Sequence, residues 1–296
     1  MSNIKLNCED GANFITGQFS PLSGQPAAPD YPLVVAIHGG TYTSGYFDVE
    51  GYSLLARATA IGIPIMAVNR PCYGDSSNGH SADGSIMSSA AIVNDALGEL
   101  WNLHGRESAG IFLIGHSIGG AVSVLIAGMR KNWPLLGIAI SGVGLRAPGH
   151  VSEQWRSLPT APSVAIPADV KDLLMYGPEG TWDPAARNAA HRADSIAPRQ
   201  ELLDIVFEWP RLLNDSAPLV NVPVHYRQPE FDNLWVVDDK EVDGFGARFT
   251  SAPVVDAQIL RATGHNADFH RIGAALQLQQ LAFGLNCAAL ARRADG

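Results

Sequence analysis

Short apolar runs alternate along the chain with segments in which apolar residues recur every three to four positions. A continuously apolar run is typical of a strand buried on both faces of a sheet, and the spaced pattern is typical of an amphipathic helix. The predicted strands are residues 33–37, 63–68, 111–114 and 135–141, and the predicted helices between them are residues 52–60, 85–103 and 118–129. This alternation indicates the α/β class, with a mainly parallel sheet covered by helices on both faces.

The two ends of the chain extend this pattern. Residues 4–7 and 13–19 flank the turn residues Glu9, Asp10 and Gly11, which predicts a β-hairpin before the first buried strand. Strand patterns return at residues 222–226 and 254–260, and an amphipathic helix is predicted over residues 268–285.

Composition changes between residues 148 and 218, where nine of the 19 prolines are found and no strong strand pattern occurs. Short helices are predicted there at residues 170–176, 184–194 and 199–213. We therefore predict a core formed by residues 1–145 and 216–296, interrupted by a helical lid formed by residues 146–215.

Charge narrows the range of partners. The chain of 296 residues has a formal net charge of -9 and no run rich in Lys or Arg, so the sequence offers no basic surface for nucleic acid or anionic lipid. The longest apolar stretches are shorter than the ~20 residues that span a bilayer. We expect a cytoplasmic protein that acts on a small molecule, and the sequence leaves its oligomeric state open.

Cysteine spacing gives no sign of a metal or a disulfide framework. Cys8, Cys72 and Cys287 lie far apart, without CxxC spacing or a nearby histidine at ligand spacing. We expect no metal and no organic cofactor.

The sequence Gly115-His116-Ser117-Ile118-Gly119 is a G-x-S-x-G motif between a predicted strand and a predicted helix. In this context a serine lies on a sharp turn with its hydroxyl exposed at the carboxyl edge of the sheet. The amide of Ile118, at the start of the helix, is placed to donate to an oxyanion. The alternative is that Ser117 only caps the helix.

The sequence His38-Gly39-Gly40 follows the strand at residues 33–37 and is expected at the same edge of the sheet. Its backbone offers a second oxyanion donor, the amide of Gly40 or that of Thr41 beside it. An ordinary tight turn is the alternative for the two glycines.

A base and an acid are expected in later loops. His265, in Gly264-His265-Asn266, follows the last predicted strand and is the best candidate to accept the Ser117 proton. The acid that orients this imidazole is expected between serine and histidine in chain order. The loop after residues 222–226 provides Asp232 as first choice and Glu230 as second, although either could be a solvated charge.

These motifs together resemble the α/β-hydrolase family over nearly all of the chain outside the predicted lid. The resemblance also includes Arg70-Pro71-Cys72-Tyr73-Gly74-Asp75-Ser76. It implies that Ser117 is the nucleophile, His265 the base and Asp232 the acid. It also implies that residues 146–215 occupy the place of the family's lid.

The expected reaction is hydrolysis of a carboxylic ester or lactone through an acyl-enzyme on Ser117. Large apolar side chains in the lid indicate either a hydrophobic substrate or packing within the lid itself, and we expect Trp182, Trp209 and His116 at the substrate site. One alternative is a thioesterase or acyltransferase for carrier-bound acyl chains, for which Arg146 and Arg156 are the available basic residues. The other is a non-catalytic small-molecule receptor with the same fold.

Overall fold

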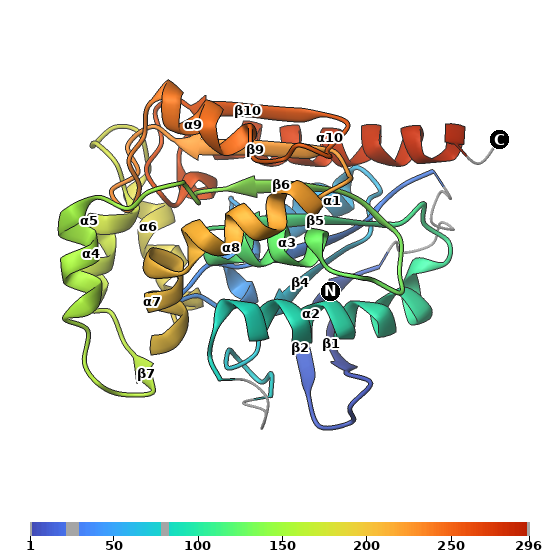
Figure 1. Ribbon diagram of the computed structural model, residues 1–296, viewed down its shortest axis with the longest axis horizontal. Coiled ribbons are helices and arrows are strands. Elements are labelled where there is room, and N and C mark those ends of the chain that lie inside the picture. Colours follow the sequence, from blue (N-terminus) through green and yellow to red (C-terminus); the bar gives the residue numbers. More distant parts are fainter. Residues whose placement is uncertain (1, 22–29, 78–82, 295–296) are drawn as a thin grey trace.

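The protein folds around one eight-stranded sheet, seen in the computed structural model of residues 2–21, 30–77 and 83–294 (Figure 1). The strand order is β1-β2-β4-β3-β5-β6-β9-β10. The strands of this sheet are β1 Ser2–Asn7, β2 Phe14–Ser20, β3 Leu33–Ile37, β4 Ile65–Asn69, β5 Ile111–His116, β6 Leu135–Ser141, β9 Val224–Pro229 and β10 Val255–Leu260. β1 and β2 form the predicted antiparallel hairpin, and the other six strands of this sheet, β4-β3-β5-β6-β9-β10, are parallel to one another. The predicted fold class is therefore confirmed.

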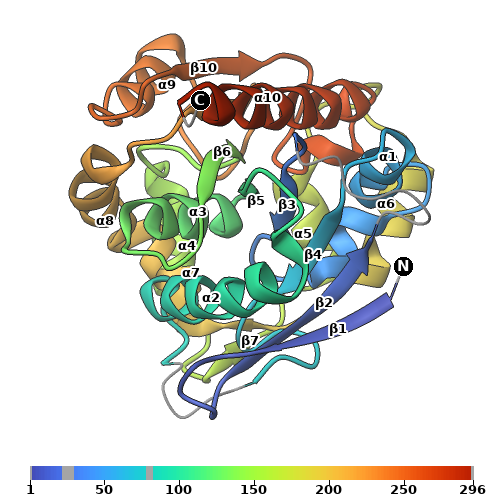
Figure 2. The same ribbon diagram turned by 90° about the vertical axis from the view of Figure 1, so that its right-hand side faces the viewer.

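Helices cover both faces of the sheet (Figure 2). One face packs against α2 Ile86–Leu100 and α3 Ile118–Gly128, and the other against α1 Leu54–Ala60 and α10 Gly273–Ala294. β3 shows why its run is continuously apolar. Leu33, Val35 and Ile37 enter one hydrophobic cluster while Val34 and Ala36 enter the other, because successive strand residues point to opposite faces.

A series of short elements lies between β6 and β9, and all of them except α8 extend past one end of the sheet (Figure 1). They are α4 Gly149–Arg156, β7 Ser163–Val164, α5 Ala168–Met175, α6 Pro184–Ala190, β8 Ala197–Pro198, α7 Arg199–Phe207 and α8 Trp209–Ser216. α8 lies along α3 on the face of the sheet, whereas α4 and α7 pack together at its end. In the text below, the insertion means residues 149–207.

Several helices differ from the prediction. The helix predicted over residues 199–213 is broken at Glu208, because Pro210 lies in the first turn of α8 and cannot continue a preceding helix. α4 was not predicted. Nor was α9 Asp239–Gly246, which Asp238 caps by accepting from the Glu241 amide at 2.8 Å.

Candidate active site

Ser117 lies on a strained turn between β5 and α3. Its backbone has φ 53° and ψ -123°, a combination that L-residues rarely adopt. The flanking glycines make the turn possible. A Cβ at Gly115 would lie 2.4 Å from the carbonyl oxygen of Gly119, and a Cβ at Gly119 would lie 2.0 Å from that of Ile37. The turn leaves the Ser117 hydroxyl in contact with His265.

His265 lies between the last strand and the last helix, as expected. Its Nε2 is 2.9 Å from Ser117 Oγ, and its Nδ1 is 2.8 Å from Asp232 Oδ2. Because a carboxylate only accepts, the proton of the neutral ring is on Nδ1, and Nε2 is free to accept from the serine hydroxyl. Both His265 and Asp232 are buried.

Asp232 is held by further donors. Its Oδ2 also accepts from Gln228 Nε2 at 2.9 Å, and its Oδ1 accepts from the Leu234 amide at 2.9 Å. Glu230, the second choice for the acid, lies elsewhere. Its carboxylate accepts from Arg261 Nη1 at 2.9 Å and from the Ala262 amide at 2.8 Å, and these bonds lower its pKa.

The segment His38–Thr41, called here the oxyanion loop, passes close to Ser117. A Cβ at Gly39 would lie 3.0 Å from the Ser117 Cβ, and one at Gly40 would lie 2.9 Å from the Ile118 side chain. The Thr41 amide already donates to the Tyr73 hydroxyl at 3.2 Å. Within the described part of the chain, no residue accepts from the Gly40 amide. Of the two alternatives for the second donor, Gly40 is therefore the better placed.

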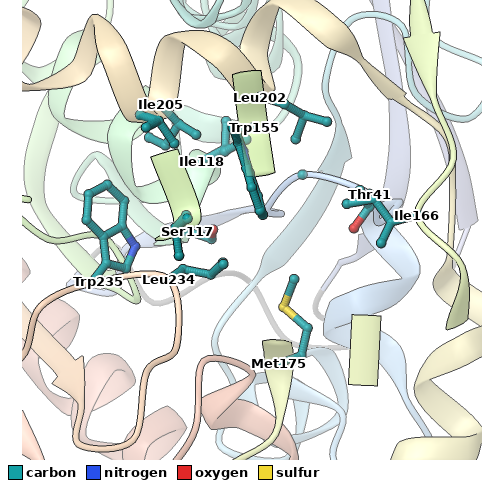
Figure 3. A pocket seen from close by; sticks show the side chains of 13 residues that line it. Thr41, Ser117, Ile118, Trp155, Ile166, Met175, Leu202, Ile205, Leu234 and Trp235 are labelled. Atoms are coloured by element: carbon teal, nitrogen blue, oxygen red, sulfur yellow. The ribbon is translucent and has the colours of Figure 1, made fainter. Parts of the chain in front are cut away.

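A narrow apolar cavity opens at Ser117, with a volume of about 40 Å³ (Figure 3). Side chains from α4, α5, α7 and the loop after β9 surround it. Its lining residues are Gly40, Thr41, Ser117, Ile118, Val151, Trp155, Ile166, Met175, Leu202, Ile205, Val206, Leu234 and Trp235. None of these carries an ionisable carboxylate, ammonium or guanidinium group, so the cavity suits an uncharged group.

A family model described as the alpha/beta hydrolase family matches residues 34–273. This chain belongs to that family. The match confirms the family that the motifs resembled and the hydrolase class that they predicted.

Known proteins similar to this α/β hydrolase include a toxin and two solved enzymes. The chain is 27% identical over 189 residues to a multifunctional-autoprocessing repeats-in-toxin protein of Vibrio cholerae serotype O1. That match covers 60% of the chain and 4% of the toxin. An esterase structure from Thermogutta terrifontis superposes with a TM-score of 0.68 at 16% identity, covering 96% of this chain and 99% of that one.

The second solved structure is the thioesterase domain from the curacin biosynthetic pathway. It superposes with a TM-score of 0.60 at 16% identity, covering 95% of the α/β hydrolase and 99% of that domain. At these identities the likeness shows the fold, and the choice between ester and thioester does not follow from it.

Three residues expected at the substrate site of the α/β hydrolase do not line the cavity. Trp209 is fully buried between α8 and the core, with its indole N–H donated to the Gly144 carbonyl at 2.9 Å. Trp182 donates to the Gly177 carbonyl at 2.9 Å, away from Ser117. The His116 ring stacks on Tyr46 instead. His116 is the last residue of β5, and its side chain points to the face of the sheet opposite that of Ser117 because successive strand residues alternate.

The sequence missed other lining residues and gave a signal for some of them. Trp155, Ile166 and Met175 belong to the insertion, whose apolar content pointed to a hydrophobic site. Leu202, Ile205 and Val206 follow the helical spacing of α7, which marks a buried face without saying what it faces. Leu234 and Trp235 lie in the loop after Asp232, where no pattern indicated contact with substrate.

Buried histidines around the site are held in the neutral form. Burial lowers the pKa of His38 and His116 well below the usual range, and lowers that of His270 to about 4. His270 lies before α10 and not inside the helix predicted over residues 268–285. Its Nε2 accepts from the Gly264 amide at 2.8 Å, which fixes the backbone next to His265.

No cluster of three or more His, Cys, Asp or Glu side chains among the described residues could hold a metal ion. No helix within the ranges 2–21, 30–77 and 83–294 is long and apolar enough to cross a membrane.

Proposed function

We propose that the protein is a serine hydrolase that cleaves carboxylic esters or lactones with an uncharged hydrophobic acyl group, through an acyl-enzyme on Ser117. The observation that carries this proposal is the hydrogen-bonded chain from Ser117 through His265 to Asp232, which ends at the mouth of an apolar cavity.

Acylation begins when Ser117 Oγ attacks the carbonyl carbon of the substrate and its proton moves to His265 Nε2. The carbonyl oxygen becomes an oxyanion, which accepts from the amides of Ile118 and Gly40. Ile118 suits this role because the first residue of a helix has no intrahelical acceptor for its amide. His265 then gives its proton to the leaving oxygen, and the alcohol departs from an ester or remains on the acyl chain of an opened lactone.

Deacylation repeats these steps with water. His265 takes a proton from water, the hydroxide oxygen attacks the acyl carbon, and the proton then returns to Ser117 Oγ as the acid leaves. Asp232 stabilises the imidazolium that forms twice in each cycle and keeps the Nδ1 proton in place.

The basic residues considered for a carrier-bound substrate make other contacts. Arg146 Nη2 lies 2.7 Å from Glu241 Oε1 in an ion pair. The guanidinium carbon of Arg156 lies 4.8 Å from the centre of the Phe207 ring. Neither lines the cavity. These contacts favour esters and lactones over thioesters of charged carriers.

A substrate panel tests the proposal. We expect p-nitrophenyl esters of short uncharged acids, or medium-ring lactones, to be hydrolysed with a higher kcat/KM than acyl-CoA thioesters of the same acyl length. Preference for the thioesters would overturn the ester assignment. Absence of turnover on every class, with Ser117 unreactive, would support a receptor instead.

A further inference from the structure

The oxyanion loop is held from outside the sheet by residues of the insertion. Arg70, which is fully buried, donates through Nε to the His38 carbonyl at 3.0 Å and through Nη2 to the Gly39 carbonyl at 3.1 Å. The same guanidinium is paired with Glu201 of α7, at 2.6 Å from Nη1 and 3.1 Å from Nη2. Glu201 is thus linked through Arg70 to two carbonyls of the loop.

Glu201 reaches the loop by a second route. The Tyr73 hydroxyl donates to Glu201 Oε1 and accepts from the Thr41 amide. Glu201 is 1% exposed. A carboxylate removed from water in this way is stable only because the guanidinium and the phenol satisfy it.

Thr41 shows why the loop needs such support. Its φ is 63°, a left-handed conformation that is unfavourable for a β-branched residue and must be imposed by its surroundings. Its carbonyl accepts from Lys171 Nζ at 2.7 Å and from the Ser195 amide at 2.9 Å. Both donors belong to the insertion.

Lys171 is itself fixed. It is 2% exposed, and its ammonium lies 2.5 Å from Asp194 Oδ1 and 3.2 Å from the centre of the Tyr42 ring. The Thr43 amide donates to the Ala193 carbonyl at 2.8 Å, so the insertion and the chain after the loop also pair through their backbones.

We propose that Glu201 and Lys171 are positioning residues for oxyanion stabilisation: the insertion holds the loop so that the Gly40 amide points at the developing negative charge. An amide donor stabilises an oxyanion only within a narrow range of distance and angle, and the loop gains this geometry from contacts that the core alone does not supply. The insertion is then part of the catalytic apparatus as well as a wall of the cavity. This inference rests on the proposed function.

The test compares Glu201→Gln and Lys171→Met with matched changes at exposed residues, Glu153→Gln on α4 and Lys240→Met on α9. We expect the first two to lower kcat on the best ester by on the order of 10- to 100-fold with KM nearly unchanged, because a displaced donor weakens only the transition state. The two matched controls should retain the wild-type values.

A pair of inhibitors separates positioning from general loss of structure. In a trifluoromethyl ketone, Ser117 Oγ adds to the carbonyl carbon, its proton moves to His265 and the carbonyl oxygen becomes the oxyanion. The corresponding trifluoromethyl carbinol fills the same cavity but cannot add. In Glu201→Gln and in Lys171→Met, the Ki of the ketone should rise in proportion to the loss of kcat, and the Ki of the carbinol should not change.

Glu201→Gln leaves the buried Arg70 without its counter-charge and therefore lowers the free energy of unfolding. Tyr73→Phe is added as a variant that avoids this loss. It keeps the Arg70–Glu201 pair and removes the hydroxyl that joins Glu201 to the Thr41 amide. A kcat loss of about 3- to 10-fold is expected, again with a higher Ki for the ketone and an unchanged Ki for the carbinol. Unchanged kcat and ketone Ki in folded Tyr73→Phe and Lys171→Met would overturn the inference. A wild-type enzyme that forms no ketone adduct would overturn the proposed function as well.

Discussion

Asp232 is oriented by its own neighbours as well as by His265. Gln228 and the Leu234 amide hold the carboxylate from two sides, so its position relative to the imidazole is fixed before any substrate binds. Glu230, two residues earlier, is turned away and bound to Arg261. The two carboxylates therefore have different expected effects when they are neutralised.

We predict that Asp232→Asn lowers kcat by about 10⁴-fold, because the amide favours the wrong imidazole tautomer and cannot stabilise the imidazolium. Binding of substrate should be mostly preserved, so the loss is expected in kcat. Glu230→Gln is the matched control and should keep wild-type kcat. Steady-state kinetics on one ester at one pH decide the matter, and the reverse ranking would assign the role to Glu230.

Acid should destabilise the folded protein through the buried ring of His270. Burial lowers the pKa of His270 from 6.5 to about 4, so between these values the unfolded chain binds a proton at His270 that the folded chain does not. Stability is therefore lost as pH falls from about 6.5 to 4, by roughly 3 kcal/mol from this group. Urea unfolding at several pH values should show a shallower pH dependence for His270→Gln than for the wild type.

The exposed His150 provides the control for this experiment. His150→Gln should retain the wild-type slope of unfolding free energy against pH. A His270→Gln variant with the same slope as the wild type would contradict the buried, neutral state of this ring.

Some candidate catalytic residues could be predicted from the sequence alone, and others could be chosen only from tertiary contacts. Ser117 and His265 follow from glycine spacing and from their order relative to strands, which are local properties. The choice between Asp232 and Glu230 depends on Arg261 and the Ala262 amide, which come from a different loop. The choice between Gly40 and Thr41 depends in the same way on Tyr73.

The helices α4 and α7 together set the size of the cavity next to Ser117. Trp155 of α4 and Leu202 of α7 line this narrow cavity together. Longer acyl groups require one of these side chains to move. The packing of α4 against α7 should therefore determine chain-length preference.

We predict that Trp155→Ala moves the preference in kcat/KM toward longer acyl esters, because removal of the indole enlarges the apolar cavity next to Ser117. Trp182→Ala, a change of the same size outside the cavity, should leave the order of preference unchanged. A series of p-nitrophenyl esters from acetate to decanoate measures both variants. The same order of preference in Trp155→Ala and the wild type would show that this residue does not limit the site.

Elements of the core were easier to predict than those of the insertion. β3, β5 and β6 are buried on both faces, so their apolar runs are continuous and their bounds nearly fixed. α4 was missed because it carries few apolar residues, with only Val151 and Trp155 buried. Trp209 was predicted at the substrate site and is not there. A large apolar residue indicates burial without indicating whether it packs on another helix or faces a ligand.

The parallel sheet brings together segments that are far apart in the sequence. Ser117 follows β5, Asp232 follows β9 and His265 follows β10, and the serine and histidine that touch are 148 residues apart. Parallel strands end at the same edge, so one fold rule places all three groups side by side. The insertion then covers this edge and supplies most of the cavity wall.

Intact-protein mass spectrometry after treatment with a fluorophosphonate measures whether Ser117 is an activated nucleophile. Attack of the Ser117 oxygen on phosphorus expels fluoride and leaves one phosphonyl group on the enzyme. We expect a single adduct in the folded wild-type protein, mapped to Ser117, and none in folded Ser117→Ala, together with loss of ester hydrolysis. An unlabelled wild type, or a Ser117→Ala variant that is labelled and active, would show that Ser117 is not the nucleophile.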